Sequence, residues 1–411
     1  MKENVFDVLM ERGFIEQVSD ADGVRAAVEQ PITCYVGFDP SASSFHVGNL
    51  VPIMALAHMQ RLGHRPIAIV GGGTGMVGDP SGKTEMRQLL TVDKIDANLQ
   101  RLKVQMGRLL DFSGGRALML NNGDWLRKLN YLEFLRDIGR HFSVNRMLAA
   151  EAYRTRYDSE GGLNFLEFNY MLLQAYDFLH LYREHGCILQ MGGNDQWGNI
   201  LAGADLIRRV DGGQAYAATF HLVTTNSGAK MGKTAAGAVW LDPELVSPYE
   251  YYQYWINTED ADVERFLALF TFLPMEQVRR LGRLTDADIR QAKEVLAFEA
   301  TSILHGEQAA QEARDASRAL FGQGAASDAL PTTEMEPEVL AAGIAAPDLF
   351  HQVGLCQSRS EARRLIQQGG AYINDAVVES VDALITVADL VDGGILMRAG
   401  KKRYHRVVPK S

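Results

Sequence analysis

The sequence predicts an α/β protein in which a parallel-sheet domain is followed by a helical domain and by a small α+β module. Three observations carry this prediction. Short apolar runs alternate with longer amphipathic segments from about residue 31 to 245, which is typical of a parallel sheet covered on both faces. Residues from about 247 to 321 show helical spacing and no strand signal. A short Pro-containing stretch then separates these helices from a compact basic tail.

We expect the sheet domain over residues 1–244, the helical domain over 245–322, a linker over 323–344 and the α+β module over 345–411. A chain of 411 residues exceeds the usual size of one domain, which supports such a division. Hydrophobic residues make up 46% of the chain and charged residues 22%, so a largely disordered protein is excluded. No apolar run approaches the roughly 20 residues that a membrane helix needs.

The net charge of −10 is unevenly distributed. Residues 345–411 carry nine basic and seven acidic residues, a net charge of +2, which leaves −12 on the rest of the chain. A uniform nucleic-acid binder is usually basic, so any contact with nucleic acid is expected to be local, at this tail. The three cysteines are far apart and lack CxxC spacing, and the N-terminal segment lacks the form of a signal peptide, so we expect a cytoplasmic protein without disulfides.

Buried strands are expected at residues 32–36, 66–70 and 187–191, with a helix from about Leu50. Each of these strands is followed by a loop that contains glycine. Because ligands of open parallel sheets bind beyond the carboxyl ends of the strands, these loops form the expected site.

The loop after the second strand, residues 73–78, matches the GxGxxG pattern of dinucleotide-binding sites. Pro80 and Gly82 interrupt the helix that such a loop should open, which argues against that interpretation. The neighbouring Gly82-Lys83-Thr84 imitates the end of a P-loop, but the preceding glycine is one residue too close. An NAD-dependent oxidoreductase therefore stays only as an alternative.

Two other loops carry groups suited to phosphate. Residues 38–49, ahead of a helix, offer hydroxyl, imidazole and backbone donors to an anion, although an ordinary helix cap explains the same residues. Lys230 and Lys233 lie in a small-residue stretch after the last strand, where they form either a phosphate clamp or a solvated basic loop.

A nearly continuous apolar helix is expected over residues 163–182. Its polar exceptions Tyr170, Gln174 and Asp177 follow i, i+4, i+7 spacing and share one face. A carboxylate on an apolar face needs a partner, so these residues form either an internal hydrogen-bond network or a binding site for a polar ligand.

Taken together, these motifs resemble a known family. The sequence His46-Val47-Gly48-Asn49 resembles the HIGH signature of class I aminoacyl-tRNA synthetases, and residues 230–234 resemble their KMSKS signature, in the same order. Residues 35–40, 78–83, 170–177 and 192–199 resemble the bacterial-type tyrosyl-tRNA synthetases. The tail around residues 359–374 resembles the S4-like RNA-binding domain that ends that family. Asn49 departs from the final His of HIGH, and the second signature reads KMGKT.

The resemblance implies a Rossmann-like catalytic domain, a helical anticodon-side domain and an S4-like domain. It implies a tyrosine–tRNA ligase that activates L-tyrosine with ATP and then transfers the tyrosyl group to the 3′-terminal ribose of tRNA(Tyr). No tightly bound cofactor and no protein metal site are expected, because Mg²⁺ enters with ATP. The family forms homodimers, and Phe165 lies on the segment that resembles their subunit contact. No membrane partner is expected.

The resemblance also assigns the site residues. The catalytic set that handles the phosphates is Ser41, His46, Lys83, Arg87, Lys230, Lys233 and Thr234. The tyrosine-binding set is Tyr35, Asp79, Tyr170, Gln174, Asp177, Gln190 and Gln196. The ATP-binding set is Gly37, Asp39, Gly48, Asn49, Gly193, Asp195 and Lys233. The RNA-binding set is Arg359, Arg363, Arg364, Lys401, Lys402 and Arg403.

Two further alternatives remain besides the oxidoreductase. A tryptophanyl enzyme shares the class I core, but a Tyr35 and Asp177 pair suits a phenol better than an indole. A non-catalytic RNA-binding protein rests on the tail alone and predicts no ATP turnover.

Overall fold

The computed structural model describes residues 3–81, 91–228, 231–234, 237–321, 330–374, 376–391, 393–400 and 403–410. It divides the chain into two compact units. The first comprises Met1–Lys233, Ala238–Asp242 and Glu259–Ala292, and the second comprises Thr234–Gly237, Pro243–Thr258 and Lys293–Ser411. Among the described residues, no helix is long and apolar enough to cross a membrane.

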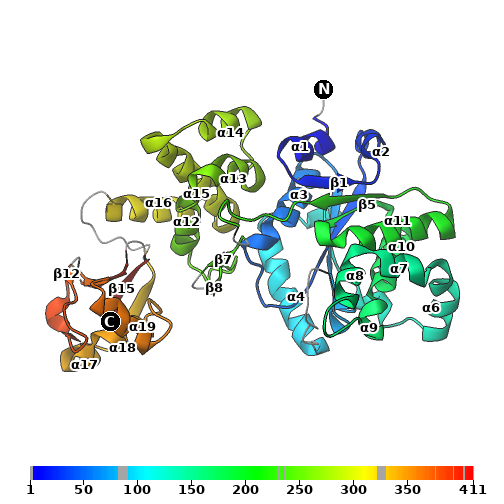
Figure 1. Ribbon diagram of the computed structural model, residues 1–411. Coiled ribbons are helices and arrows are strands. Elements are labelled where there is room, and N and C mark those ends of the chain that lie inside the picture. Colours follow the sequence, from blue (N-terminus) through cyan, green and yellow to red (C-terminus); the bar gives the residue numbers. More distant parts are fainter. Residues whose placement is uncertain are drawn as a thin grey trace. The chain divides into compact units, whose positions relative to one another are not determined.

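The first unit is built on a six-stranded sheet in the order β1-β6-β5-β2-β3-β4, in which only β1 runs antiparallel (Figure 1). The strands are β1 (Ile15–Val18), β2 (Thr33–Phe38), β3 (Arg65–Val70), β4 (Leu118–Asn121), β5 (Cys187–Gly193) and β6 (Tyr216–Phe220). The expected α/β class with a parallel sheet is confirmed. The antiparallel edge strand β1 was not expected from the sequence.

The chain order of the strands locates the site. From β2 the chain continues outward to β3 and β4, whereas β5 lies on the other side of β2 and leads to β6. The strand order therefore reverses between β2 and β5, and open parallel sheets bind ligands in the crevice at such a reversal. The loops after Phe38 and Gly193 meet there.

Both faces of the sheet are covered, which explains why β2 and β3 are apolar without alternation. On one face, Tyr35, Ile67 and Ile69 pack against Phe178 and other side chains of α10 (Tyr170–His185) and α11 (Trp197–Asp211). Helix α3 (Leu50–Arg61) also packs on β2, β3 and β5, and nearly all of its side chains are buried. The remaining α-helices of the first unit include α1 (Val5–Glu11), α2 (Ala21–Ala27), α4 (Val92–Met106), α5 (Gly123–Leu126), α6 (Tyr131–Asp137), α7 (Val144–Ala149), α8 (Glu151–Tyr157), α9 (Phe165–Phe168), α13 (Val263–Phe270) and α14 (Met275–Gly282).

The helix expected over residues 163–182 is two helices. Helix α9 begins with a capping box in which Asn164 and Glu167 bond each other's backbone amides, and it ends at Phe168. Asn169 separates it from α10, which runs on to a left-handed Gly186. The one-faced spacing of Tyr170, Gln174 and Asp177 lies wholly within α10, so the break does not affect it.

The second unit contains α12 (Pro248–Ile256) and α16 (Glu307–Phe321), and α15 (Ile289–His305) begins in the first unit and ends in the second. Residues 248–321 are largely helical, but the segment Glu259–Ala292 packs with the first unit, so the expected division at residue 244 differs from the one that the contacts make. Hydrophobic periodicity in the sequence predicts where helices form, but it does not show against which core those helices pack.

The C-terminal part of the second unit forms a sheet in the order β12-β11-β14-β15-β9 with its own apolar core. The expected linker over 323–344 is wrong in its second half. There β9 (Thr332–Met335) pairs in parallel with β15 (Arg403–Pro409), and α17 (Pro337–Ala342) buries Leu340. The other elements are β10 (Ile344–Ala345), α18 (Ala346–Gln352), α19 (Arg359–Gln367), β11 (Ala371–Ile373), β12 (Ala376–Val377), β13 (Leu384–Ile385) and β14 (Ile395–Ala399).

Candidate active site

A cavity of about 450 Å³ opens at the carboxyl ends of β2 and β5 in the first unit. It brings together most of the site residues expected from the sequence, although they come from four separate stretches of chain. The expected residues that line it are Tyr35, Gly37, Asp39, Ser41, His46, Asn49, Asp79, Tyr170, Gln174, Asp177, Gln190, Gly193, Asp195 and Gln196.

The carboxylate of Asp177 lies at the buried end of this cavity, on α10. Its two oxygens accept hydrogen bonds from Asn122 Nδ2 at 2.8 Å and from Trp125 Nε1 at 2.7 Å. Burial raises the pKa of Asp177 to about 7, and the two donors oppose that rise. Both donors are uncharged, so they hold the carboxylate in place without pairing it with a positive charge. Asn122 and Trp125 were not predicted as site residues, because the sequence indicates only that a buried Asp177 needs hydrogen-bond donors and not which residues supply them.

Two polar atoms of the cavity wall are buried and have no hydrogen-bond partner among the residues that the structure describes. They are the hydroxyl of Tyr35 and Oε1 of Gln190. Burial, and then the nearby charge of Asp177, raise the pKa of the Tyr35 phenol, so this hydroxyl stays protonated. A buried polar atom without a partner costs free energy. These atoms therefore mark a place where a polar ligand can bind.

The other expected acidic groups gather near the end of β5. Asp79 Oδ2 accepts from Gln196 Nε2 at 2.6 Å, and Asp79 Oδ1 accepts from the Ser81 amide at 2.9 Å. The same Nε2 lies 3.2 Å from an oxygen of Asp195. Burial raises the pKa of Asp79 to about 6, against the opposing effect of these hydrogen bonds. At neutral pH this corner of the cavity is anionic and suits an ammonium group.

The loop that resembles HIGH begins a helix. His46 Nδ1 accepts from the Gly48 amide at 3.0 Å, and Asn49 Oδ1 accepts from the His46 amide at 3.0 Å, which forms a reciprocal cap. Asn49 therefore keeps a hydrogen-bonding role in place of the usual His. Gly232 approaches this turn closely: a Cβ on it would lie 3.0 Å from the Gly48 nitrogen, and its φ is +78°. The two signature loops thus meet.

Only part of the expected phosphate clamp lies within the described residues. Lys83, Arg87 and Lys230 lie outside the described residues. Lys233 and Thr234 are described only as the short backbone strand β7 (Lys233–Thr234). Their assigned roles remain predictions.

The GxGxxG loop does not have the surroundings of a dinucleotide site. The Gly73 amide already donates to Asn122 Oδ1 at 2.7 Å, so it is not available to a pyrophosphate. A short 3₁₀ turn at Thr74–Met76 follows it, and among the described residues the next helix after this turn is α4. These contacts agree with the interpretation that the GxGxxG match does not mark a dinucleotide site.

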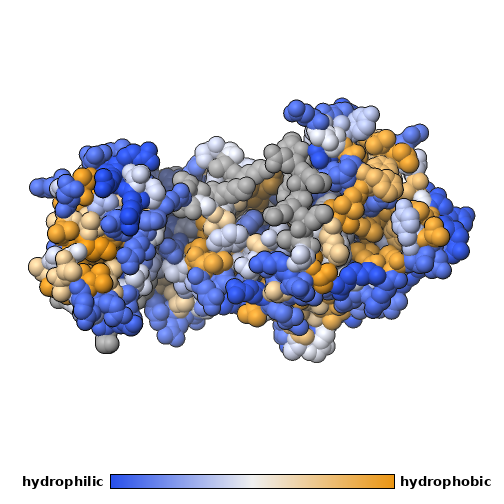
Figure 2. Space-filling model, turned by 90° about the horizontal axis from the view of Figure 1, so that it is seen from below, coloured by the Kyte–Doolittle hydropathy of each residue, from blue (hydrophilic) through white to orange (hydrophobic). Residues whose placement is uncertain are grey.

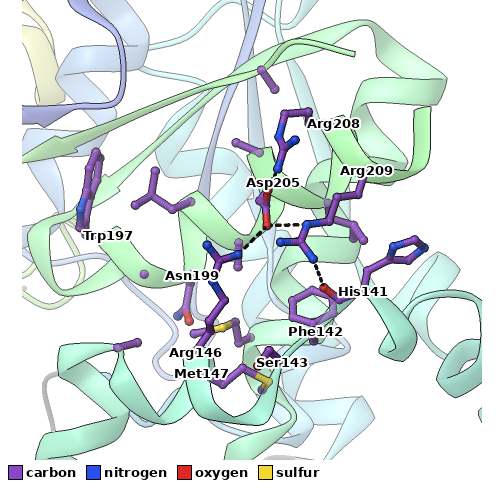
Figure 3. Close-up of a pocket in the computed structure, with 18 of the residues that line it drawn as sticks. His141, Phe142, Ser143, Arg146, Met147, Trp197, Asn199, Asp205, Arg208 and Arg209 are labelled. Carbon is purple, nitrogen blue, oxygen red and sulfur yellow. Dashed lines mark hydrogen bonds and ion pairs between the residues drawn. The ribbon is translucent and has the colours of Figure 1, made fainter. Parts of the chain in front are cut away.

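A second, larger cavity of about 1190 Å³ lies in the same unit, between α7, α8 and α11 (Figure 3). Three arginines surround Asp205 in it: Arg208 at 2.5 Å, Arg209 at 2.8 Å and Arg146 at 3.7 Å. Glu151 and Asp195 also line this cavity, so its three arginines are matched in number by three carboxylates. Asp195 lines both cavities, which makes them neighbours. These three arginines were not predicted as site residues from the sequence.

The expected RNA-binding residues of the C-terminal part lie on α19 and β15. Arg363 and Arg364 are exposed on α19, whereas Arg359 pairs with Asp348 at 2.8 Å. Arg403 lies 3.9 Å from Glu361 of the same helix. Lys401 and Lys402 lie outside the described residues.

Comparison with known proteins first identifies the class of protein. Residues 27–322 match the family described as tRNA synthetases class I (W and Y), and residues 323–407 match the one described as Tyrosine--tRNA ligase SYY-like C-terminal domain. A crystallised, C-terminally truncated mitochondrial tyrosyl-tRNA synthetase from Aspergillus nidulans is similar with a TM-score of 0.70 and 30% identity, over 78% of this chain and 94% of that one. The chain thus belongs to the class I tRNA synthetases and has their fold.

Curated relatives narrow the class further. The chain is 58% identical to a tyrosine--tRNA ligase of Desulfosudis oleivorans, over 98% of this chain and 99% of the relative. It is 56% identical to one from Caldanaerobacter subterraneus, over 99% of this chain and 100% of the relative. The chain belongs to the tyrosine--tRNA ligase family, which confirms the resemblance drawn from its motifs.

Proposed function

We propose that this chain is a ligase that joins L-tyrosine to tRNA(Tyr) in two steps. In the first, a carboxylate oxygen of tyrosine attacks the α-phosphorus of ATP, a P–O bond forms, and pyrophosphate leaves. In the second, a hydroxyl of the 3′-terminal ribose attacks the acyl carbon and AMP leaves. A carboxylate is already a nucleophile, so neither a general base nor a covalent enzyme intermediate is needed in the first step. The protein contributes alignment and stabilisation of charge.

The observation that carries this proposal is the polar floor of the smaller cavity. A phenol bound there donates its hydrogen to Asp177 and accepts one from the unpartnered Tyr35 hydroxyl. Phenylalanine leaves both groups unpaired in a buried place, which costs free energy. An indole offers one donor and no oxygen acceptor, so it satisfies Asp177 and leaves Tyr35 without a partner. The floor therefore favours tyrosine.

The remaining site residues fit the other parts of the substrates. Asp79, Tyr170 and Gln174 are proposed to bind the ammonium group of tyrosine, with Gln190 nearby and Gln196 on the carboxylate. Gly37, Asp39, Gly48, Asn49, Gly193 and Asp195 are proposed to bind the adenosine part of ATP. Ser41, His46, Lys83, Arg87, Lys230, Lys233 and Thr234 are proposed to hold the phosphates, which bring Mg²⁺ with them.

The second step needs a path for the 3′ end of tRNA. The larger cavity shares Asp195 with the smaller one and presents three arginines, which supports it as the approach for a polyanionic strand. We further propose that the C-terminal part binds RNA as an S4-like module through Arg359, Arg363, Arg364, Lys401, Lys402 and Arg403.

A homodimer is proposed from an apolar surface on the first unit. Phe165 is 69% exposed, and Leu132, Val144, Tyr157 and Leu166 are exposed on the neighbouring helices α6 to α9. Hydrophobic side chains gather on the right-hand part of Figure 2, the part of the molecule that holds these helices in Figure 1. A cluster of this kind is typical of a subunit contact. Sedimentation as a dimer that Phe165→Asp converts to a monomer is the expected result.

We propose a cytoplasmic location because all three cysteines are buried and free in the structure, as in proteins of reducing compartments.

The function itself is tested by ATP–pyrophosphate exchange with tyrosine, phenylalanine and tryptophan in parallel. Exchange that depends on tyrosine alone is the expected result. Equal exchange with tryptophan, or NADH binding without any exchange, would overturn the proposal.

A further inference from the structure

Asn194 follows directly on β5 and makes three hydrogen bonds to side chains of two other strands. Its Oδ1 accepts from Gln17 Nε2 at 2.6 Å and from Thr219 Oγ1 at 3.1 Å. Its Nδ2 donates to Glu16 Oε1 at 2.9 Å. Every bond pairs a donor with an acceptor, so the orientation of the amide is determined by its surroundings.

The sheet register explains why these groups meet. Thr219 of β6 lies opposite Gln17 of the antiparallel strand β1 on one side and opposite Gly192 of β5 on the other. Asn194 is therefore held at the end of β5 by both neighbouring strands. Thr219 is fully buried, which makes its hydroxyl a rigid anchor. The edge strand β1 contributes to this network because it supplies Gln17 and Glu16.

Asn194 does not line the smaller cavity, although the next two residues in the chain do. The three residues form one 3₁₀ turn, Asn194–Gln196, so fixing the first of them fixes the direction of the other two. Asp195 folds back over Gly193, where an added Cβ would lie 2.5 Å from Asp195 Oδ1. Gln196 spans Asp79 and Asp195. A small rotation of this turn displaces both side chains.

We propose that Asn194 is a positioning residue for the activation step. Through Gln17 and Thr219 it orients the turn that presents Asp195 to the ribose of ATP and Gln196 to the carboxylate of tyrosine. The inference rests on the proposed function for the roles of those two side chains. It predicts that loss of the anchor harms adenylate formation and the use of ATP, while the phenol end of the tyrosine site, on β2 and α10, is unaffected.

The test compares Asn194→Ala with wild type in tyrosine-dependent ATP–pyrophosphate exchange and in equilibrium binding of tyrosine. The expected result is a fall of about tenfold in kcat/KM for ATP, since small misplacements of reacting groups have effects of that order or larger. The dissociation constant of tyrosine is expected to rise by less than the loss in kcat/KM for ATP, because Gln196 contacts only the carboxylate end of tyrosine, and the Tyr:Phe selectivity is expected to stay the same. Thr219→Val keeps the side-chain shape, removes one anchor and is expected to act in the same direction.

The double variant Asn194→Ala with Thr219→Val is expected to be no worse than Asn194→Ala alone, because both changes break the same contact. Gln60→Ala is a matched control: Gln60 also donates and accepts through its amide, to the backbone of Asp111, away from the cleft. Wild-type kinetics in both Asn194→Ala and Thr219→Val would overturn the inference, as would equal losses in tyrosine binding and turnover together with a lower Tm. Absence of exchange in the wild type would instead reject the proposed function.

Discussion

At the scale of single residues, the cleft is defined by which buried groups have partners and which do not. Asp177 has two neutral donors, whereas the hydroxyl of Tyr35 has no partner over the described ranges of the chain. The sequence indicated that a carboxylate on the apolar face of a helix requires partners. It could not identify Asn122 and Trp125, because they follow β4, about fifty residues away in the chain, and only the folded sheet brings them to α10.

The raised pKa of Asp177 predicts a pH dependence of selectivity. As the pH falls through about 7, Asp177 gains a proton and no longer accepts the hydrogen of the phenol. The kcat/KM for tyrosine should therefore fall relative to that for phenylalanine, by up to about tenfold per pH unit below 7. Asp79, whose pKa is raised to about 6, serves both amino acids equally and cancels in the ratio.

The measurement is the ratio of the two exchange rates between pH 5.5 and 8.5. Asp177→Asn removes the titrating group and should give a lower ratio that does not depend on pH. A wild-type ratio that is flat across this range would show that the ionisation of Asp177 does not govern the choice of substrate.

At the scale of secondary structure, most of the strands and helices that surround the site could be predicted from the sequence. The positions at which helices are interrupted could not. Strands β2, β3 and β5 are apolar because both of their faces are covered, and this signal is local. The end of α9 depends on Asn169, which is also compatible with a continuing helix. Strand β9 reads as part of a linker because its partner, β15, comes about seventy residues later.

One contact between elements is expected to matter for stability. Arg12, at the end of α1, donates to the carbonyls of Ala268, Thr271 and Leu273 at 2.9, 3.0 and 2.5 Å, which satisfies the end of α13. Arg12→Ala leaves these carbonyls without donors and should lower the free energy of unfolding by about 2–4 kcal/mol.

Urea unfolding of the variant measures this loss. Arg25→Ala is the matched control, because Arg25 belongs to the same N-terminal region and pairs at 2.9 Å with Asp7 on the surface. It should cost less than about 1 kcal/mol. Equal stability of the two variants would mean that the end of α13 does not depend on Arg12.

At the scale of the whole molecule, charge is divided between a strongly acidic body and a weakly basic C-terminal segment. The division of the chain into two contact units could not be predicted, since whether helices 259–292 pack with the sheet or with later helices is a property of tertiary contacts. The charge asymmetry was predictable, because it depends on composition alone.

This asymmetry predicts separate effects on the two steps. Replacing Arg363 and Arg364, both exposed on α19, with Ala should raise the KM for tRNA(Tyr) by about tenfold and make its salt dependence shallower. Tyrosine-dependent pyrophosphate exchange should not change, because it needs no RNA. Aminoacylation assays at two salt concentrations measure the first effect, and an unchanged KM for tRNA would exclude this helix face from RNA binding.

The central claim is that the buried hydroxyl of Tyr35 is reserved for the phenol of the substrate, and Tyr35→Phe tests it most directly. Because this hydroxyl has no partner in the described part of the chain, its removal should leave the Tm of the free protein unchanged or higher. The Tyr:Phe ratio of kcat/KM should fall by about tenfold, the value of one hydrogen bond. A lower Tm with an unchanged ratio would contradict the claim, because the hydroxyl would then serve the fold and not the substrate.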